Sequence, residues 1–157
     1  SLVADLAKIA NVVGIKDSRG SLELVAEWVD RTPDTFQVLV GSGAILYGGL
    51  EVGAVGGVLA VANLAPGPAS AIHAAHRAGD SAEAGRMQEL VAPVHVEIVA
   101  GMGVPGVKAG LDLLGLRGGD PRLPLRPLPD RDRDNVAEVL ATAQTWPAVV
   151  DGASSAL

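Results

Sequence analysis

Cysteine is absent from this 157-residue chain, and aromatic residues are scarce, with one Phe, one Tyr and two Trp. The absence of cysteine excludes disulfides, thiolate metal ligands and cysteine nucleophiles. His73, His76 and His95 are not accompanied by carboxylates at metal-ligand spacing, so no metal site is predicted. Because aromatics are so few, the core must be built from aliphatic side chains.

An excess of positive charge is also missing. The net charge is −6, and acidic and basic residues are interspersed. The sequence therefore predicts no basic patch that would bind nucleic acid or an anionic membrane. No apolar run of transmembrane length lacks Gly, Pro or charge, and the N-terminus has no basic segment followed by an apolar one. We therefore expect a cytoplasmic protein that handles small molecules, with neither nucleic acid nor a membrane as partner.

Three short apolar runs, at residues 11–16, 36–40 and 54–62, predict strands. Helical spacing of apolar residues over 21–31 and 44–52 places one helix between each pair of strands, with Ser21 as the N-cap of the first. Two successive crossovers of this kind imply parallel strands. The predicted fold class is α/β.

Beyond Asn63 the strand signals stop and the chain is predicted to be helical to its end. A proline-rich connector is expected at residues 118–129, and the last residues, 151–157, are expected to fray. Ser81 is the predicted cap of the second of these helices, and Pro93 is predicted to kink it. The predicted helices cover residues 66–78, 81–100, 104–114 and 130–145.

Lys16 ends the first apolar run, directly before a polar turn. At the end of a buried strand its amine would lie at the mouth of a core, where desolvation disfavours the ammonium form and makes the amine available as a nucleophile. The alternative is a strand-end lysine whose amine simply reaches solvent. Lys16 is therefore a candidate for Schiff-base chemistry on a carbonyl substrate.

A short glycine-rich segment, Gly41-Ser42-Gly43, follows the second predicted strand and opens a helix. Backbone N–H groups at such a position can receive a phosphate or carboxylate. The segment lacks the full spacing of a nucleotide-binding fingerprint, and no lysine or arginine lies in it. A turn that relies on the conformational freedom of glycine is the favoured interpretation.

Five segments of the chain carry a resemblance through their sequence and their order: VVGIKDSRG (12–20), FQVLVGSGAIL (36–46), GAVGGVLAVANLAP (53–66), GMGVPGVKAGLDLLGL (101–116) and GGDPRLPLRPL (118–128). In this order they resemble the C-terminal half of the dihydrodipicolinate synthase and N-acetylneuraminate lyase family of class I pyruvate aldolases. Within that family the motif sequences are most similar to those of 4-hydroxy-2-oxoglutarate aldolases, and dihydrodipicolinate synthases are the alternative.

The resemblance implies strands six to eight of a (β/α)8 TIM barrel followed by a C-terminal helical extension. Residues 1–64 would be the partial barrel, 65–145 the last barrel helix with the helical extension, and 146–157 a tail. Lys16 would be the Schiff-base lysine at the C-terminal end of the sixth strand, which is the catalytic face of such a barrel. The residues expected to bind substrate are Ser18, Gly41, Ser42, Val58, Leu59 and Ala60.

The implied chemistry is that of a lyase or aldolase on pyruvate-derived 2-oxo acids. It needs no cofactor, because the lysine itself forms the iminium that acts as electron sink. The aldolase would cleave 4-hydroxy-2-oxoglutarate to pyruvate and glyoxylate, and the synthase would condense pyruvate with aspartate semialdehyde. The resemblance also implies a homo-oligomer, a dimer or tetramer.

The family's first five strands have no counterpart in this sequence, nor do the hydroxyl residues and proton-relay tyrosine that the family carries there. Tyr47, the only tyrosine, lies on a predicted helix and does not match that position. We therefore expect an incomplete barrel that requires the missing N-terminal half and is inactive alone. A different hypothesis is a non-catalytic remnant, or the partner half of a split barrel.

Overall fold

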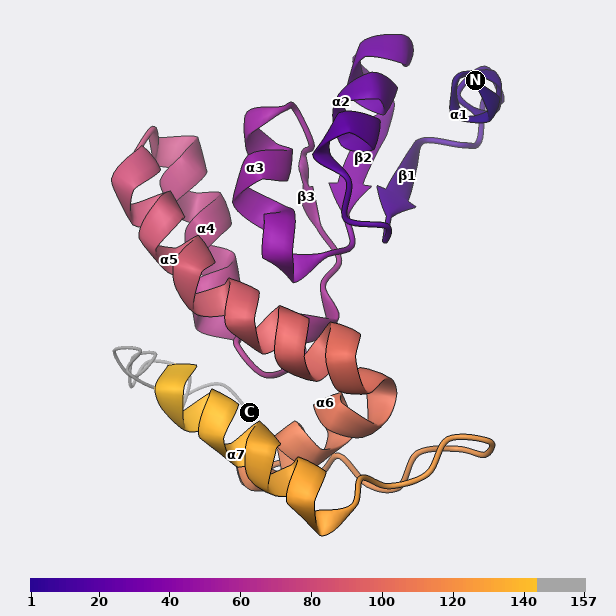
Figure 1. The fold of residues 1–157 in the computed structure, drawn as a ribbon. Helices are drawn as coiled ribbons and strands as arrows, with labels where there is room; N and C mark the ends of the chain where they lie inside the picture. Colours follow the sequence, from indigo (N-terminus) through magenta and orange to yellow (C-terminus); the bar gives the residue numbers. More distant parts are fainter. Residues whose placement is uncertain (144–157) are drawn as a thin grey trace, which may run out of the picture.

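Three short parallel strands followed by a run of helices make up the computed structural model, which describes residues 1–143 (Figure 1). The sheet has the order β1-β2-β3, with β1 at Gly14–Asp17, β2 at Gln37–Val40 and β3 at Gly56–Gly57. Lys16 is in register with Leu39. The α/β class and the parallel strands predicted from the two crossovers are confirmed.

The crossovers form largely where the apolar spacing predicts them. The first is α2 (Leu22–Arg31), and Ser21 caps it as expected, since its hydroxyl accepts a hydrogen bond from the Leu24 N–H at 3.3 Å. The second is divided into a 3₁₀ turn, η1 (Gly43–Ile45), and α3 (Leu46–Glu51), where a single helix was predicted. The helix α2 packs against β2, and α3 packs against β3.

The third strand is much shorter than the predicted 54–62. Its pairing with β2 is flanked by backbone hydrogen bonds from Val55 N to Val38 O (3.0 Å) and from Val58 N to Val40 O (2.9 Å). Because β2 ends at Val40, the following residues have no strand to pair with, and they fold into the 3₁₀ helix η2 (Ala60–Asn63). The long apolar run predicted the strand but not where it stops.

Helices follow to the end of the described chain, as predicted. Asp80 rather than Ser81 is the N-cap of the second helix, because the Asp80 carboxylate accepts from the Glu83 N–H. At Pro93, where a kink was predicted, the α-helix ends and the chain continues directly as a π-helix. No regular element lies between 117 and 129, as expected for the connector. The helices are α4 (Pro66–Ala78), α5 (Ser81–Pro93), η3 (Val94–Ala100), α6 (Gly101–Leu113) and α7 (Asp130–Ala143).

Two further differences concern the ends of the chain. A short helix, α1 (Leu2–Leu6), precedes the first strand and was not predicted. The predicted last helix begins at Asp130 as expected, whereas its final residues, 144–145, and the tail 146–157 lie outside the described residues.

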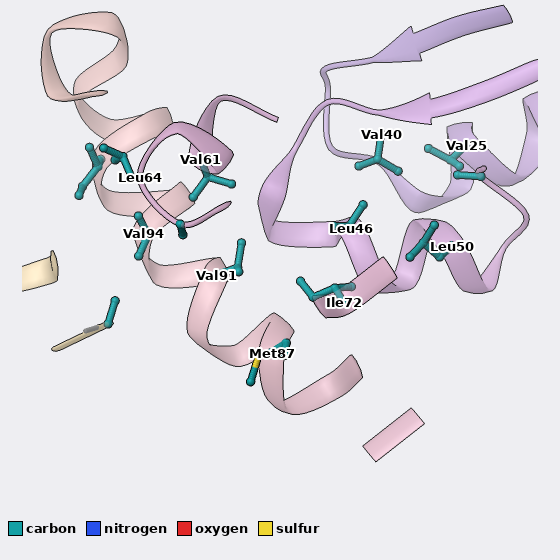
Figure 2. Close-up of a cluster of buried hydrophobic side chains, with 14 of the residues drawn as sticks. Val25, Val40, Leu46, Leu50, Val61, Leu64, Ile72, Met87, Val91 and Val94 are labelled. Atoms are coloured by element: carbon teal, nitrogen blue, oxygen red, sulfur yellow. The ribbon is translucent and has the colours of Figure 1, made fainter. Parts of the chain in front are cut away.

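One largely aliphatic cluster, which also includes Trp28 and Phe36, joins the sheet to the C-terminal helices. In Figure 2, Val40 from β2 and Leu46 and Leu50 from α3 lie near Ile72 of α4, and the row continues along α5 and η3. The C-terminal helices are therefore fixed to the crossover elements by burial of apolar surface. The labelled members are Val25, Val40, Leu46, Leu50, Val61, Leu64, Ile72, Met87, Val91 and Val94.

One face of the sheet is left open by the described residues. Side chains alternate between the two faces of a strand. On the covered face Asp17 and Val40 are buried, whereas on the other face Lys16 is exposed and Leu39 is half-buried. Val58, directly after β3, is 53% exposed. Within residues 1–143, faces that a closed barrel would bury are thus open, as expected for an incomplete barrel.

The helical stretch Ser81–Leu113 is long and apolar enough to cross a membrane by length and composition, and 22% of its apolar window is buried. The stretch contains Pro93 and Pro105, and its backbone is non-helical at Gly103 (φ 63°, ψ −150°), so it is not one uninterrupted helix. Val91 and Ile98 from this stretch belong to the core. A helix that supplies core residues is weak support for a membrane span.

Candidate functional site

Lys16 lies near the C-terminal end of β1 with its amine exposed. Among residues 1–143 no hydrogen bond or ion pair holds this amine, whereas the other lysines of the chain are engaged. Lys8 Nζ lies 2.8 Å from Asp5 Oδ1, and Lys108 Nζ donates to Gly118 O at 2.6 Å. The predicted shielding of Lys16 at the mouth of a core is wrong for the described chain, because no element covers this face of the sheet.

Gly41 lies directly against Lys16 and Ser18. A Cβ atom at Gly41 would be 2.6 Å from Lys16 Cε, 2.6 Å from Ser18 Oγ and 2.5 Å from the Asp17 carbonyl oxygen. The Gly41 N–H also donates to that carbonyl, at 2.5 Å. Three of the residues singled out by sequence, Lys16, Ser18 and Gly41, therefore lie together at the C-terminal ends of two neighbouring strands.

The turn after Lys16 is organised by Asp17. Its buried carboxylate accepts from the Gly20 N–H at 3.1 Å and from Arg19 Nε at 3.2 Å. The Arg19 guanidinium in turn lies 5.0 Å from the ring centroid of Trp28. Gly20 adopts φ 75°, a left-handed conformation that glycine takes without strain. Asp17 thus orders the turn that carries Ser18.

Ser42 does not share this open face. Its side chain is buried, and its hydroxyl lies 3.0 Å from His95 Nε2 of η3. The next N–H, that of Gly43, donates to His95 Nδ1 at 3.2 Å. The N–H groups of Gly41 and Gly43 therefore already have partners within the chain, which favours the turn over an anion site.

Val58 and Leu59 join β3 to η2, and Ala60 is the first residue of η2. The Val58 N–H bonds to Val40 O, next to Gly41, so this segment borders the same edge of the sheet. Val58 and Ala60 are exposed, and Leu59 is half-buried and packs against the core. Backbone and apolar groups rather than charges line this side of the open face.

His95 is expected to make the stability of the protein depend on pH. Burial lowers the pKa of its imidazole, because desolvation disfavours the charged ring. Below about pH 6.5, the ordinary value, the unfolded chain therefore binds more protons than the folded one, and the free energy of unfolding falls as pH is lowered. In urea titrations between pH 7.5 and 5.5, His95→Asn should fall less steeply than the wild type; parallel slopes would contradict this.

Solved structures of dihydrodipicolinate synthases share this arrangement, and they define it as part of an α/β barrel with a helical end. The chain superposes with a TM-score of 0.82 on a putative dihydrodipicolinate synthase from Thermus thermophilus, at 38% identity, covering 91% of this chain and 50% of that one. It matches dihydrodipicolinate synthase DapA-2 from Bacillus anthracis equally well, with a TM-score of 0.82, 30% identity and coverage of 92% and 49%.

The chain belongs to the dihydrodipicolinate synthetase family, whose model matches residues 1–143. It is 40% identical to an uncharacterised DapA-like lyase of Halobacterium salinarum over 83% of this chain and 43% of the relative. It is 34% identical to 4-hydroxy-tetrahydrodipicolinate synthase of Methanoculleus marisnigri, over 88% and 48%. The chain thus spans about half the length of these relatives, and their names do not support the finer resemblance to 4-hydroxy-2-oxoglutarate aldolases.

Two residues at this edge of the sheet were missed by reasoning from the sequence, His95 and Gln88. Gln88 lies on α5, and its side chain reaches the segment that follows β2. Nothing in their local spacing points to that segment, whose residues lie 41 to 53 positions earlier in the chain. Only the packing of the C-terminal helices against η1 brings them there.

Proposed function

We propose that this chain is the C-terminal part, strands six to eight and the following helices, of a Schiff-base-forming lyase or aldolase that acts on pyruvate-derived 2-oxo acids. The observation that carries the proposal is Lys16. It is the lysine whose amine has no partner among the described residues, and it lies beside Gly41 at the C-terminal ends of parallel strands. In α/β barrels that end of the sheet is the catalytic face.

In the proposed reaction the neutral Lys16 amine attacks the keto carbon of the 2-oxo acid, and the carbonyl oxygen leaves as water. The resulting iminium withdraws electrons, and this stabilises the enamine needed to make or break a carbon–carbon bond. Ser18 and Gly41 border the reacting carbon, and Val58, Leu59 and Ala60 supply the wall on the β3 side. No cofactor or metal is needed for these steps.

A neutral amine requires that water be kept from Lys16. We propose that strands beyond those of residues 1–143 close the open face, desolvate Lys16 and supply a proton relay. Exposure of Lys16 and Val58 supports this requirement for a complementary half barrel. A homo-oligomer in the cytoplasm is the setting we expect, by analogy with the family.

The substrate is the finer part of the proposal. The relatives named 4-hydroxy-tetrahydrodipicolinate synthase favour condensation of pyruvate with aspartate semialdehyde. The amino-acid sequence of the motifs around Lys16 and Gly41 favours cleavage of 4-hydroxy-2-oxoglutarate to pyruvate and glyoxylate. Both reactions pass through the same pyruvate adduct, so assays of the two with one preparation would choose between them.

The test of the shared step is borohydride reduction in the presence of pyruvate, followed by peptide mass mapping. It is applied to this chain and to any longer natural form that carries further sequence upstream. We expect a reduced pyruvate adduct on Lys16 in a preparation with a closed barrel, and none on Lys8 or Lys108, whose amines are engaged.

The outcomes separate the hypotheses. An adduct on the longer form but not on this chain would show that the site needs the complementary half. An adduct on this chain without further sequence would show that the open face suffices. No adduct on Lys16 in either form would overturn the proposal and favour a non-catalytic remnant.

A further inference from the structure

Two side chains from the C-terminal helices reach across the molecule to the segment that follows β2. Gln88 on α5 donates from Nε2 to Gly43 O and accepts at Oε1 from Tyr47 N, both at 2.8 Å. His95 on η3 accepts at Nδ1 from Gly43 N at 3.2 Å, and its Nε2 lies 3.0 Å from Ser42 Oγ. Gln88 and His95 thus reach the same segment from two successive helical elements.

Together they bind both polar groups of the Gly43 backbone. Because the Gly43 N–H donates to His95 Nδ1, that nitrogen carries no proton, and the ring proton lies on Nε2, where it is donated to Ser42 Oγ. In a doubly protonated ring Nδ1 would carry a hydrogen, and it could no longer accept the hydrogen bond from the Gly43 N–H. Burial lowers the pKa of His95 and thereby favours the neutral ring that this geometry needs.

The segment held in this way is the wall beside Lys16. Gly41 precedes Ser42 directly, and a Cβ at Gly41 would be 2.6 Å from Lys16 Cε. The segment has little room to move toward η2 either, since a Cβ at Gly43 would be 2.5 Å from Val61 Cγ1. Hydrogen bonds from α5 and η3 therefore decide where the backbone next to Lys16 lies.

We propose that Gln88 and His95 are positioning residues that hold the Gly41–Gly43 segment against Lys16, so that the C-terminal helices are part of the catalytic apparatus rather than an appended layer. This rests on the proposed function of Lys16. Neither side chain is required to touch the 2-oxo acid. Both act through the backbone of Gly43, and the π-helix that presents His95 is a distortion often found at functional sites.

The test compares variants of the protein in its longest active form. His95→Leu removes both hydrogen bonds to the segment, and Gln88→Met removes both of its own while keeping a similar length. Each should lower the rate of pyruvate adduct formation and kcat by about 10- to 100-fold, since small misplacements of reacting groups cost this much. His95→Asn, whose Oδ1 can replace Nδ1 as the acceptor for the Gly43 N–H, should recover most of the rate.

A matched control is His73→Leu, because His73 is half-buried on α4 and lies outside this segment. It should leave the rate within about twofold of the wild type. Thermal unfolding of every variant shows whether it is folded at the assay temperature. Folded His95→Leu and Gln88→Met proteins with unchanged rates would overturn the proposal, and so would a His95→Asn protein as slow as His95→Leu.

Amide hydrogen exchange at Gly43 and Tyr47 separates this inference from the proposed function. Loss of the side-chain partners should speed exchange at Gly43 in His95→Leu and at Tyr47 in Gln88→Met. Faster exchange without any pyruvate adduct in the wild type would mean that the segment is held as described but that the function of Lys16 is wrong. Unchanged exchange in a wild type that does form the adduct would overturn the positioning role alone.

Discussion

Replacement of Lys16 by arginine is expected to abolish trapping of pyruvate and to lower turnover by about 10³-fold or more, as removal of a covalent nucleophile does. Arginine retains the positive charge and the approximate length of the side chain. Its guanidinium does not lose a proton in proteins and so cannot attack the keto carbon. Because Lys16 is exposed and has no partner among the described residues, the fold should tolerate the change.

The matched control for this experiment is Lys8→Arg. Lys8 is also exposed, and its pairing with Asp5 across one turn lies outside the site. Such a surface pair contributes little to stability, and arginine can replace it. Turnover and trapping should be unchanged in this variant. Equal activity of Lys16→Arg and Lys8→Arg would remove Lys16 from the mechanism.

Elements of this fold that depend on neighbours in sequence could be predicted. The Ser21 cap and the α2 helix are local, and two helices between strands impose parallel pairing. The end of β3 could not be predicted, because it is set by the length of β2, a different part of the chain. The π-helix after Pro93 likewise gives no local signal that distinguishes it from a kinked α-helix.

The candidate site divides in the same way. The grouping of Lys16, Ser18 and Gly41 follows from their places at the ends of adjacent parallel strands, so sequence order and the family resemblance could indicate it. The hydrogen bond between the Ser42 hydroxyl and His95 could not be predicted from the sequence. That hydrogen bond spans 53 residues, and no spacing rule for a single element relates positions so far apart.

Substitution of Gly41 by alanine is expected to have the second large effect, and its cause is a steric clash rather than the loss of a reactive group. The added Cβ would lie 2.5 Å from the Asp17 carbonyl oxygen, which is backbone and cannot swing aside, and 2.6 Å from both Lys16 Cε and Ser18 Oγ. The two strand ends must therefore separate, which weakens the hydrogen bond from Gly41 N to Asp17 O. Overpacking of this kind costs about 1–3 kcal/mol of stability.

For the same reason Lys16 should be displaced from its reactive position, and we expect the rate of pyruvate adduct formation in Gly41→Ala to fall by about 10²-fold. Gly85→Ala is the matched control, because nothing lies within 4 Å of a Cβ at Gly85 in α5. Alanine there should raise the free energy of unfolding by about 0.5–1 kcal/mol and leave the rate unchanged. Urea unfolding and borohydride trapping measure the two effects separately. A Gly41→Ala protein that is destabilised yet reacts at the wild-type rate would show that close contact between Gly41 and Lys16 matters for the fold and not for the chemistry.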